Sequence, residues 1–130
     1  MDDPIALDTH SLIWYLIKAP TLSARARAAI EPVFLEKREA ILPTLVLAEM
    51  QTVIAKHRMS VDLAAFIESI PGTGCRIVPF DEVVLRRYLS LRARLDIFDR
   101  IIVATALVYN APLVTRDPMI VASATVPVVW

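Results

Sequence analysis

The chain has 130 residues, of which 56% are hydrophobic, and its 14 Lys+Arg balance its 14 Asp+Glu. This length predicts one domain over residues 1–130 with a buried core, and the zero net charge excludes a global basic field for nucleic acid, although not a local patch. Cys75 is the single cysteine, which excludes a disulfide framework and favours a reducing compartment.

The N-terminal part of the chain predicts a buried strand followed by two helices. It begins with Met1-Asp2-Asp3-Pro4, which lacks the basic region of a signal peptide. Ile5–Leu7 is continuously apolar, as strands of parallel sheets are. Ser11–Ile17 has helical character, and Ser23–Ile30, opened by a capping serine, is a second helix. No apolar run in the chain approaches the ~20 residues of a membrane span, so we expect a cytoplasmic protein with no membrane partner.

The middle of the chain predicts two further strands and two further helices. Ala40–Leu42 is a strand, ended by Pro43, with Thr44 as the N-cap of a helix over Leu45–Arg58. On a helical wheel Glu49 falls about 40° from Val53, at the border of the apolar arc. The other predicted elements here are a helix over Val61–Ile70, a turn over Pro71–Gly74 and a strand over Arg76–Phe80.

The C-terminal part predicts two helices and two strands. Asp81 can cap Val83–Leu95, whose apolar residues keep helical spacing. Phe98–Tyr109 is apolar nearly all round, which marks a helix buried in the middle of the fold. The last strands are Pro112–Thr115 and Val126–Trp130. Strands that alternate with helices predict an α/β fold with a mostly parallel sheet covered on both faces, where ligands bind beyond the carboxyl ends of the strands.

Four acidic residues stand at the ends of these apolar segments or inside them: Asp8, Glu49, Asp99 and Asp117. A carboxylate carried into a core loses much of its hydration energy unless a partner compensates. The simplest shared partner is a divalent cation, and ligands that are all oxygen favour Mg²⁺ or Mn²⁺. If the strands before Asp8 and Asp117 are neighbours, their spacing of roughly 4.8 Å lets both carboxylates reach one metal ion.

Helix capping is the competing explanation for three of these acids. Aspartate is a favoured N-cap, so Asp8, Asp99 and Asp117 could each simply start a helix. Glu49 resists this explanation, because it lies a turn inside a predicted helix and beside an apolar stripe. Asp96, three residues before Asp99, could join the site, or it could end the preceding helix and face solvent.

The neighbours of the acids are candidate substrate contacts. Arg100 and Arg116 could hold phosphate, or they could merely offset the carboxylates. Thr9 and Thr115 could contact phosphate or metal-bound water, although turns and caps explain them as well. Leu12, Trp14 and Tyr15 lie at helical spacing, and such residues belong more often to a core or a dimer interface than to a ligand platform.

Several enzyme classes are excluded. Gly72 and Gly74 are the only glycines, too few for a P-loop or a dinucleotide fingerprint. His10 stands where a haloacid-dehalogenase phosphatase would carry a second aspartate, and no lysine follows Lys56, as a response-regulator receiver would need. His10 and His57 are too few and too separated for a zinc site, and we expect His10 to form a hydrogen bond near the end of the first strand.

The acidic residues lie in four motifs that occur in the order found in PIN-domain ribonucleases: Leu7-Asp8-Thr9-His10, Leu47-Ala48-Glu49-Met50, Phe98-Asp99-Arg100-Ile101-Ile102-Val103-Ala104 and Val114-Thr115-Arg116-Asp117. The whole chain resembles VapC-type toxins of bacterial type II toxin–antitoxin pairs. By position, Asp8, Glu49, Asp99 and Asp117 match the family's acidic quartet, and Asp96 matches an additional acid of one subgroup. Ile97 departs from that subgroup, which usually has proline there.

The resemblance implies a three-layer α/β/α PIN-like fold, dependence on Mg²⁺ or Mn²⁺, and hydrolysis of RNA. It also implies homodimers that are inhibited by a cognate antitoxin, in a pair or a larger toxin–antitoxin assembly. In the chemistry it implies, Asp8 and Asp117 anchor the main metal ion. Glu49 and Asp99 complete the site, through water or by holding a second ion.

Two other functions stay open. A housekeeping PIN nuclease for RNA processing would have no antitoxin, and a non-catalytic PIN-like module would hold RNA or a protein without cutting. Loss of one of the four acids would indicate the module, and none is lost here.

Overall fold

Five parallel strands form the centre of the computed structural model, which describes residues 2–130. Met1, part of the predicted domain, lies outside the described residues. The strand order is β3-β2-β1-β4-β5, and every neighbouring pair is parallel. The strands are β1 Asp2–Leu7, β2 Arg38–Pro43, β3 Cys75–Val78, β4 Leu113–Val114 and β5 Val128–Val129. The predicted α/β fold with a mostly parallel sheet of about five strands is therefore confirmed.

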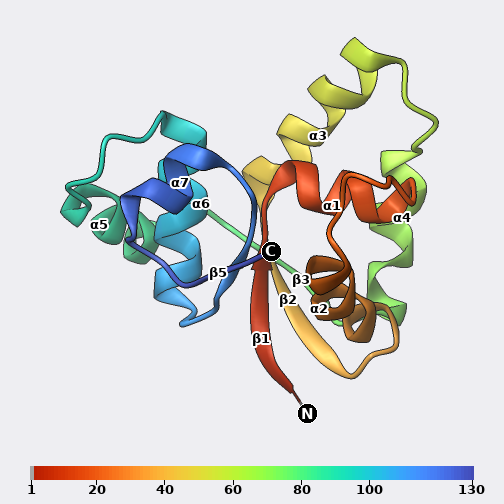
Figure 1. Cartoon of the computed structure of the whole chain (residues 1–130), viewed down its shortest axis with the longest axis horizontal. Coiled ribbons are helices and arrows are strands. Elements are labelled where there is room, and N and C mark those ends of the chain that lie inside the picture. The colour runs from red at the N-terminus through yellow and green to blue at the C-terminus, as the bar shows by residue number, and fades with distance from the viewer. Residues whose placement is uncertain (1) are drawn as a thin grey trace.

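Helices cover both faces of this sheet. They are α1 Thr9–Leu16, α2 Ala24–Phe34, α3 Thr44–His57, α4 Leu63–Ser69, α5 Glu82–Ser90, α6 Ile97–Val108 and α7 Pro118–Ser123, with a short 3₁₀ turn, η1, over Ile70–Gly72. Figure 1 shows α1, α2 and α4 on one side of the strands and α5, α6 and α7 on the other. The three-layer α/β/α arrangement implied by the PIN resemblance is thus confirmed. None of the helices in residues 2–130 is both long and apolar enough to cross a membrane.

The sheet and α6 form the centre of the core. The side chains of Ile5, Ala6 and Leu7 in β1 are at most 1% exposed, which explains why this strand is continuously apolar rather than alternating. In α6 every residue from Ile101 to Ala106 is buried, and the helix packs against β1 and β2. The all-round apolar pattern therefore predicted the position of this helix correctly.

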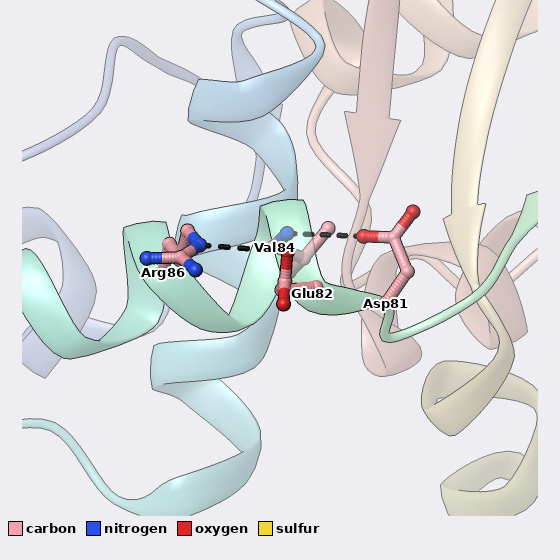
Figure 2. Close-up of polar contacts among 4 residues, drawn as sticks. All are labelled: Asp81, Glu82, Val84 and Arg86. Carbon is pink, nitrogen blue, oxygen red and sulfur yellow. Dashed lines mark hydrogen bonds and ion pairs between the residues drawn. The ribbon is translucent and has the colours of Figure 1, made fainter.

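Aspartate and serine side chains begin most of the helices. Ser23 caps α2 as predicted, and its hydroxyl accepts a hydrogen bond from the Ala26 amide. Asp81 caps α5 by accepting from the Val84 amide at 3.0 Å (Figure 2). Asp62, which the sequence analysis placed inside a helix, is instead the N-cap of α4, so that helix begins at Leu63.

Several predicted boundaries were wrong; α2, for example, ends at Phe34 rather than Ile30. Three others differ for identifiable reasons. Thr44 is not an N-cap but the first residue of α3, because its hydroxyl donates to the carbonyl of Val78 in β3. The first helix begins at Thr9 rather than Ser11, since Asp8 caps it. The helix after Asp81 ends at Ser90 rather than Leu95, and the segment before α6 is irregular.

Candidate active site

The carboxyl ends of β1 and β4 create the edge on which the candidate site is built. Leu7 pairs with Val114 in a parallel register, so Asp8 and Thr115 follow on adjacent strands. The strands before Asp8 and Asp117 are therefore neighbours, which is the condition for both carboxylates to reach one metal ion. Ligand sites in parallel sheets lie at this edge, beyond the carboxyl ends of the strands.

Asp8 is a buried carboxylate that also caps a helix. One of its oxygens accepts a hydrogen bond from the Ser11 amide at 2.8 Å, at the start of α1. The Ser11 hydroxyl donates in turn to the Val114 carbonyl at 2.9 Å, which fastens α1 to β4. Burial raises the pKa of Asp8, although hydrogen bonds from Thr115 and Ser11 partly oppose this. The capping explanation is thus correct for Asp8, but it does not remove the cost of burying the charge.

Asp117 begins α7 in the same way. Its carboxylate accepts hydrogen bonds from the amides of Met119 at 2.9 Å and Ile120 at 3.1 Å. Its own amide donates to the Thr115 hydroxyl at 3.0 Å. Thr115 is fully buried, so its side chain orients the two aspartates and is not placed to contact a substrate phosphate. Thr115 is therefore withdrawn as a phosphate contact.

Glu49 lies in the second turn of α3 and is tied to α1. The hydroxyl of Thr9 donates a hydrogen bond to Glu49 Oε1, which connects the first residue of α1 to α3. Glu49 is half-buried and caps no helix. The expectation that Glu49 lies at the border of the apolar face of its helix is confirmed. Thr9 is fully buried at this position, which makes it a positioning residue for Glu49.

Asp96 and Asp99 both belong to the start of α6. Asp96, not Asp99, is the N-cap, and it accepts a hydrogen bond from the Asp99 amide at 2.8 Å. Burial, followed by the charges of Asp117, Asp96, Glu49 and Asp8 in that order, raises the pKa of Asp99 to about 7. Capping therefore does not account for Asp99. The carboxylates of Asp117, Asp96, Glu49 and Asp8 are thus close enough to Asp99 to disfavour its charged form.

One cleft of about 410 Å³ contains these acids. It is lined by the five carboxylates together with Thr9, His10, Trp14, Ile102, Arg116 and Pro118. The structure thus brings together residues from four helices and two strand ends that are far apart in the sequence. Carboxylates gathered in this way repel one another unless a cation lies between them.

The family model for the PIN domain matches residues 5–124. The chain belongs to the PIN domain family. Members of this family are nucleases, and they generally use divalent metal ions. No curated protein matched the sequence.

Solved structures with this PIN fold include toxin–antitoxin proteins. VapBC2 from Rickettsia felis, bound to a DNA fragment from its promoter, matches with a TM-score of 0.70 at 18% identity, covering 96% of each chain. FitAcB from Neisseria gonorrhoeae matches with a TM-score of 0.68 at 26% identity, covering 95% of each chain. A toxin–antitoxin complex from Klebsiella pneumoniae matches with a TM-score of 0.63 at 21% identity, covering 87% and 86%. The predicted resemblance to VapC-type PIN proteins is confirmed.

The acids of this PIN domain fit a hard divalent cation by their chemistry. Their donors are all carboxylate oxygens, which Mg²⁺ and Mn²⁺ prefer, and their mutual repulsion would be relieved by a cation. Among residues 2–130, no three His, Cys, Asp or Glu side chains are arranged to hold a metal ion as they stand.

The two candidate arginines have different environments in the PIN fold. The Arg100 guanidinium donates to the carbonyls of Leu91 at 2.8 Å, of Ala93, and of Tyr88 at 3.4 Å, and it lies 5.3 Å from the centre of the Tyr88 ring. These bonds hold the irregular segment between α5 and α6. Arg100 does not line the cleft, so it is withdrawn as a phosphate contact.

Arg116 does line the cleft, with its guanidinium 4.8 Å from the centre of the Trp14 ring. Trp14 also faces the cleft, which the sequence analysis did not favour. The sequence does contain a pattern that indicates this position. Asp8 caps α1, and His10 lies four residues before Trp14, so both side chains share one face of that helix. His10 is exposed beside Trp14, with ring centres 5.5 Å apart. In the described residues its side chain forms no hydrogen bond at the end of β1, so that expectation was wrong.

Proposed function

We propose that this PIN domain is a metal-dependent endoribonuclease that acts as the toxin of a type II toxin–antitoxin pair. The observation that supports it most strongly is the convergence of five carboxylates in one cleft at the carboxyl ends of parallel strands. The likeness in fold to toxin–antitoxin proteins supports the toxin role. Residues 1–130 would act as one domain in the cytoplasm.

In this proposal Asp8 and Asp117 hold the principal Mg²⁺ or Mn²⁺ ion, and Glu49 and Asp99 complete its site. The bound ion would supply an activated water and stabilise charge that develops on the phosphate. The protein contributes orientation: the capping bonds use only one oxygen of Asp8 and one of Asp117. Thr9 orients Glu49, and Asp96 holds the first turn of α6 beneath Asp99.

Protonation of Asp99 sets a condition for activity. With its pKa raised to about 7, Asp99 is protonated in a large fraction of molecules at neutral pH. A cation in the cleft would favour its charged form, because opposite charge lowers the pKa of a carboxyl group. We therefore expect metal binding to weaken steeply below neutral pH. Asp96 lies on the exposed side of the cluster and would contribute charge rather than a direct ligand.

Cleavage of RNA by the purified, antitoxin-free protein tests the enzymatic part of the proposal. We expect cleavage with Mn²⁺ or Mg²⁺, none in EDTA, and recovery when metal is restored. Asp8→Asn should abolish cleavage, and Asp62→Asn, which changes the cap of α4 outside the cleft, should leave it unchanged. Cleavage that persists in EDTA, or an Asp8→Asn variant with the wild-type rate, would contradict the proposal.

Growth of cells that express the chain tests the toxin part. We expect expression alone to arrest growth and co-expression of a cognate antitoxin to restore it. Normal growth with abundant folded protein that cleaves RNA would indicate the housekeeping nuclease instead. We further propose a homodimer, for which light scattering of the purified chain should give twice its 14.5 kDa mass.

A further inference from the structure

The cleft has an aromatic and cationic margin beside the carboxylates. It is formed by His10 and Trp14 from α1, Arg116 from the segment before α7, and Trp130, and we call these four residues the rim. The Arg116 guanidinium lies 4.8 Å from the centre of the Trp14 ring and 6.0 Å from that of Trp130. The two indole rings meet edge to face with centres 5.9 Å apart. His10, Trp14 and Arg116 line the same cleft as the acids.

The charge of Arg116 is not used by the protein itself. In the part of the chain that the structure describes, the ion pairs join Arg76 to Glu39 and Arg86 to Glu82. Arg116 is exposed and makes no side-chain hydrogen bond there, although Asp117 is its neighbour in sequence. Its guanidinium is held by ring faces alone, so its five N–H donors remain available to a ligand in the cleft.

We propose that the rim binds an unpaired nucleotide of a single-stranded RNA next to the acids, which makes its residues determinants of substrate binding. This rests on the proposed nuclease function. Bases stack on aromatic rings and on arginine planes, and arginine also binds phosphate, so one group can recognise both parts of a nucleotide. Bases within a duplex are already paired and stacked, and they are not available to such a rim.

The position of the rim follows from helix geometry. Asp8 caps α1, and Trp14 lies six residues further along, which places it about 9 Å away along the helix axis at 1.5 Å per residue. The same rigid helix therefore carries a proposed metal ligand and a proposed stacking residue. A base bound at the rim would therefore hold its neighbouring phosphate at a fixed distance from the acidic residues.

A purely structural role does not account for the whole rim. Trp14 and Trp130 are half-buried and pack against the hydrophobic core, which explains their inner surfaces. Arg116 is exposed and adds nothing to that core. If the rim is only structural, replacing Arg116 should leave RNA affinity unchanged. If it binds RNA, the same replacement should weaken affinity without unfolding the protein.

Tryptophan fluorescence gives a direct readout of the rim, because both tryptophans of the chain belong to it. The full-length Asp8→Asn variant in Mg²⁺ would be titrated with a short single-stranded RNA, which it should not cut. We expect the single strand to quench the emission, and the same RNA annealed to its complement to quench it far less. Equal quenching by both forms, or none by either, would overturn the inference.

Substitutions then separate binding from packing. Arg116→Ala and Trp14→Leu, which remove the guanidinium and the aromatic face, should raise the Kd for the single strand by roughly 5- to 150-fold, the range for loss of one stacking contact. In the Asp8-containing protein they should raise KM with kcat little changed. Arg76→Ala is the matched control, because it removes another guanidinium held over a ring, 5.3 Å from the centre of Tyr109, outside the cleft. Melting curves check that all variants are folded.

The outcomes distinguish this inference from the proposed function. If the wild type cleaves RNA and the rim variants bind it as tightly as Arg76→Ala does, the rim inference fails and the nuclease stands. If the wild type cleaves no RNA but the single strand still binds through Arg116 and Trp14, the nuclease proposal fails and the rim stands. Rim variants that keep RNA affinity but lose an antitoxin peptide would also overturn the inference.

Discussion

Asp99 is the residue whose chemistry depends most on its neighbours. Its pKa is raised from 3.8 to about 7, first by burial and then by four other carboxylates. In the metal-free protein, the unfolded chain releases this proton at lower pH than the folded chain does. Over this range the folded chain keeps a proton on Asp99 that the unfolded chain has lost. The free energy of unfolding therefore falls as pH rises from about 4 through about 7.

This sign leads to a prediction for Asp99→Asn in EDTA. The variant cannot titrate at this position, so the wild type should lose stability relative to the variant as pH rises from 5 to 8. The free energy of unfolding at each pH, from urea titration, measures the difference. If the difference in the free energy of unfolding between the two proteins stays constant over this range, the pKa of Asp99 is not raised by the neighbouring carboxylates.

Arg100 shows how one side chain can hold an irregular segment. Its guanidinium donates to the carbonyl of Tyr88 in the last turn of α5 and to those of Leu91 and Ala93 beyond the end of that helix. Arg100→Lys loses the planar fork that reaches them, so we expect a loss of about 1–2 kcal/mol in stability by urea unfolding. Arg86→Lys is the control: its pair with Glu82 is exposed at 3.6 Å, and it should change stability by less than about 0.5 kcal/mol (Figure 2).

At the scale of elements, helix capping and the proposed metal binding involve the same aspartates. Asp8, Asp96 and Asp117 are each the N-cap of a helix. The sequence analysis considered capping for Asp8 and Asp117 but not for Asp96. The caps fix where each carboxylate stands, and the sheet edge brings them into one cleft. The two explanations are therefore not alternatives at these positions.

Asparagine separates the two uses at Asp117. It caps a helix about as well as aspartate does, so Asp117→Asn should keep the metal-free melting temperature within about 2 °C while losing the response to Mn²⁺. Asp117→Ala should in addition lose about 0.5–2 kcal/mol of stability. Asp62→Asn, at the cap of α4 outside the cleft, should keep both properties. If Asp117→Asn responds to Mn²⁺ as the wild type does, Asp117 is a cap and nothing more.

The elements that the sequence predicted correctly are those whose patterns are local. Continuous apolar runs identified β1 and α6, and Ser23 identified the start of α2. The end of α5 could not be predicted, because it depends on hydrogen bonds from Arg100, which lies on another helix. Thr44 was misjudged for the same reason, since its hydroxyl is engaged by a carbonyl of β3.

The candidate site could be predicted in part. The acids were recognisable because charge at the edge of apolar segments requires a partner. The roles of Arg100, Thr115 and Trp14 were not recognisable. Arg100 and Arg116 each adjoin an acid in sequence, yet Arg100 binds the Leu91 carbonyl and Arg116 lies over the Trp14 ring. Which side chain lines a cleft is decided by packing between elements, and a single sequence does not display it.

On the scale of the whole molecule, the cleft stores repulsion that a cation should relieve. A cation that binds only the folded state adds about 2.7 kcal/mol of stability at a hundredfold excess over Kd. For a domain of this size that is roughly a 10 °C rise in melting temperature. We expect Mn²⁺ to produce a rise of this order in the wild type by calorimetry and a smaller one in Asp99→Asn. Equal rises in both proteins would exclude Asp99 from the site.

Direct titration with Mn²⁺, followed by electron paramagnetic resonance of the free ion, tests the claim that the acids form one metal centre. The wild type at pH 8 should remove Mn²⁺ from solution with saturation at one or two ions per chain. Asp8→Asn and Asp117→Asn should each bind at least tenfold more weakly, and Asp62→Asn should bind as the wild type does. Saturable binding that is the same in all four proteins, or its absence in the wild type, would contradict the account.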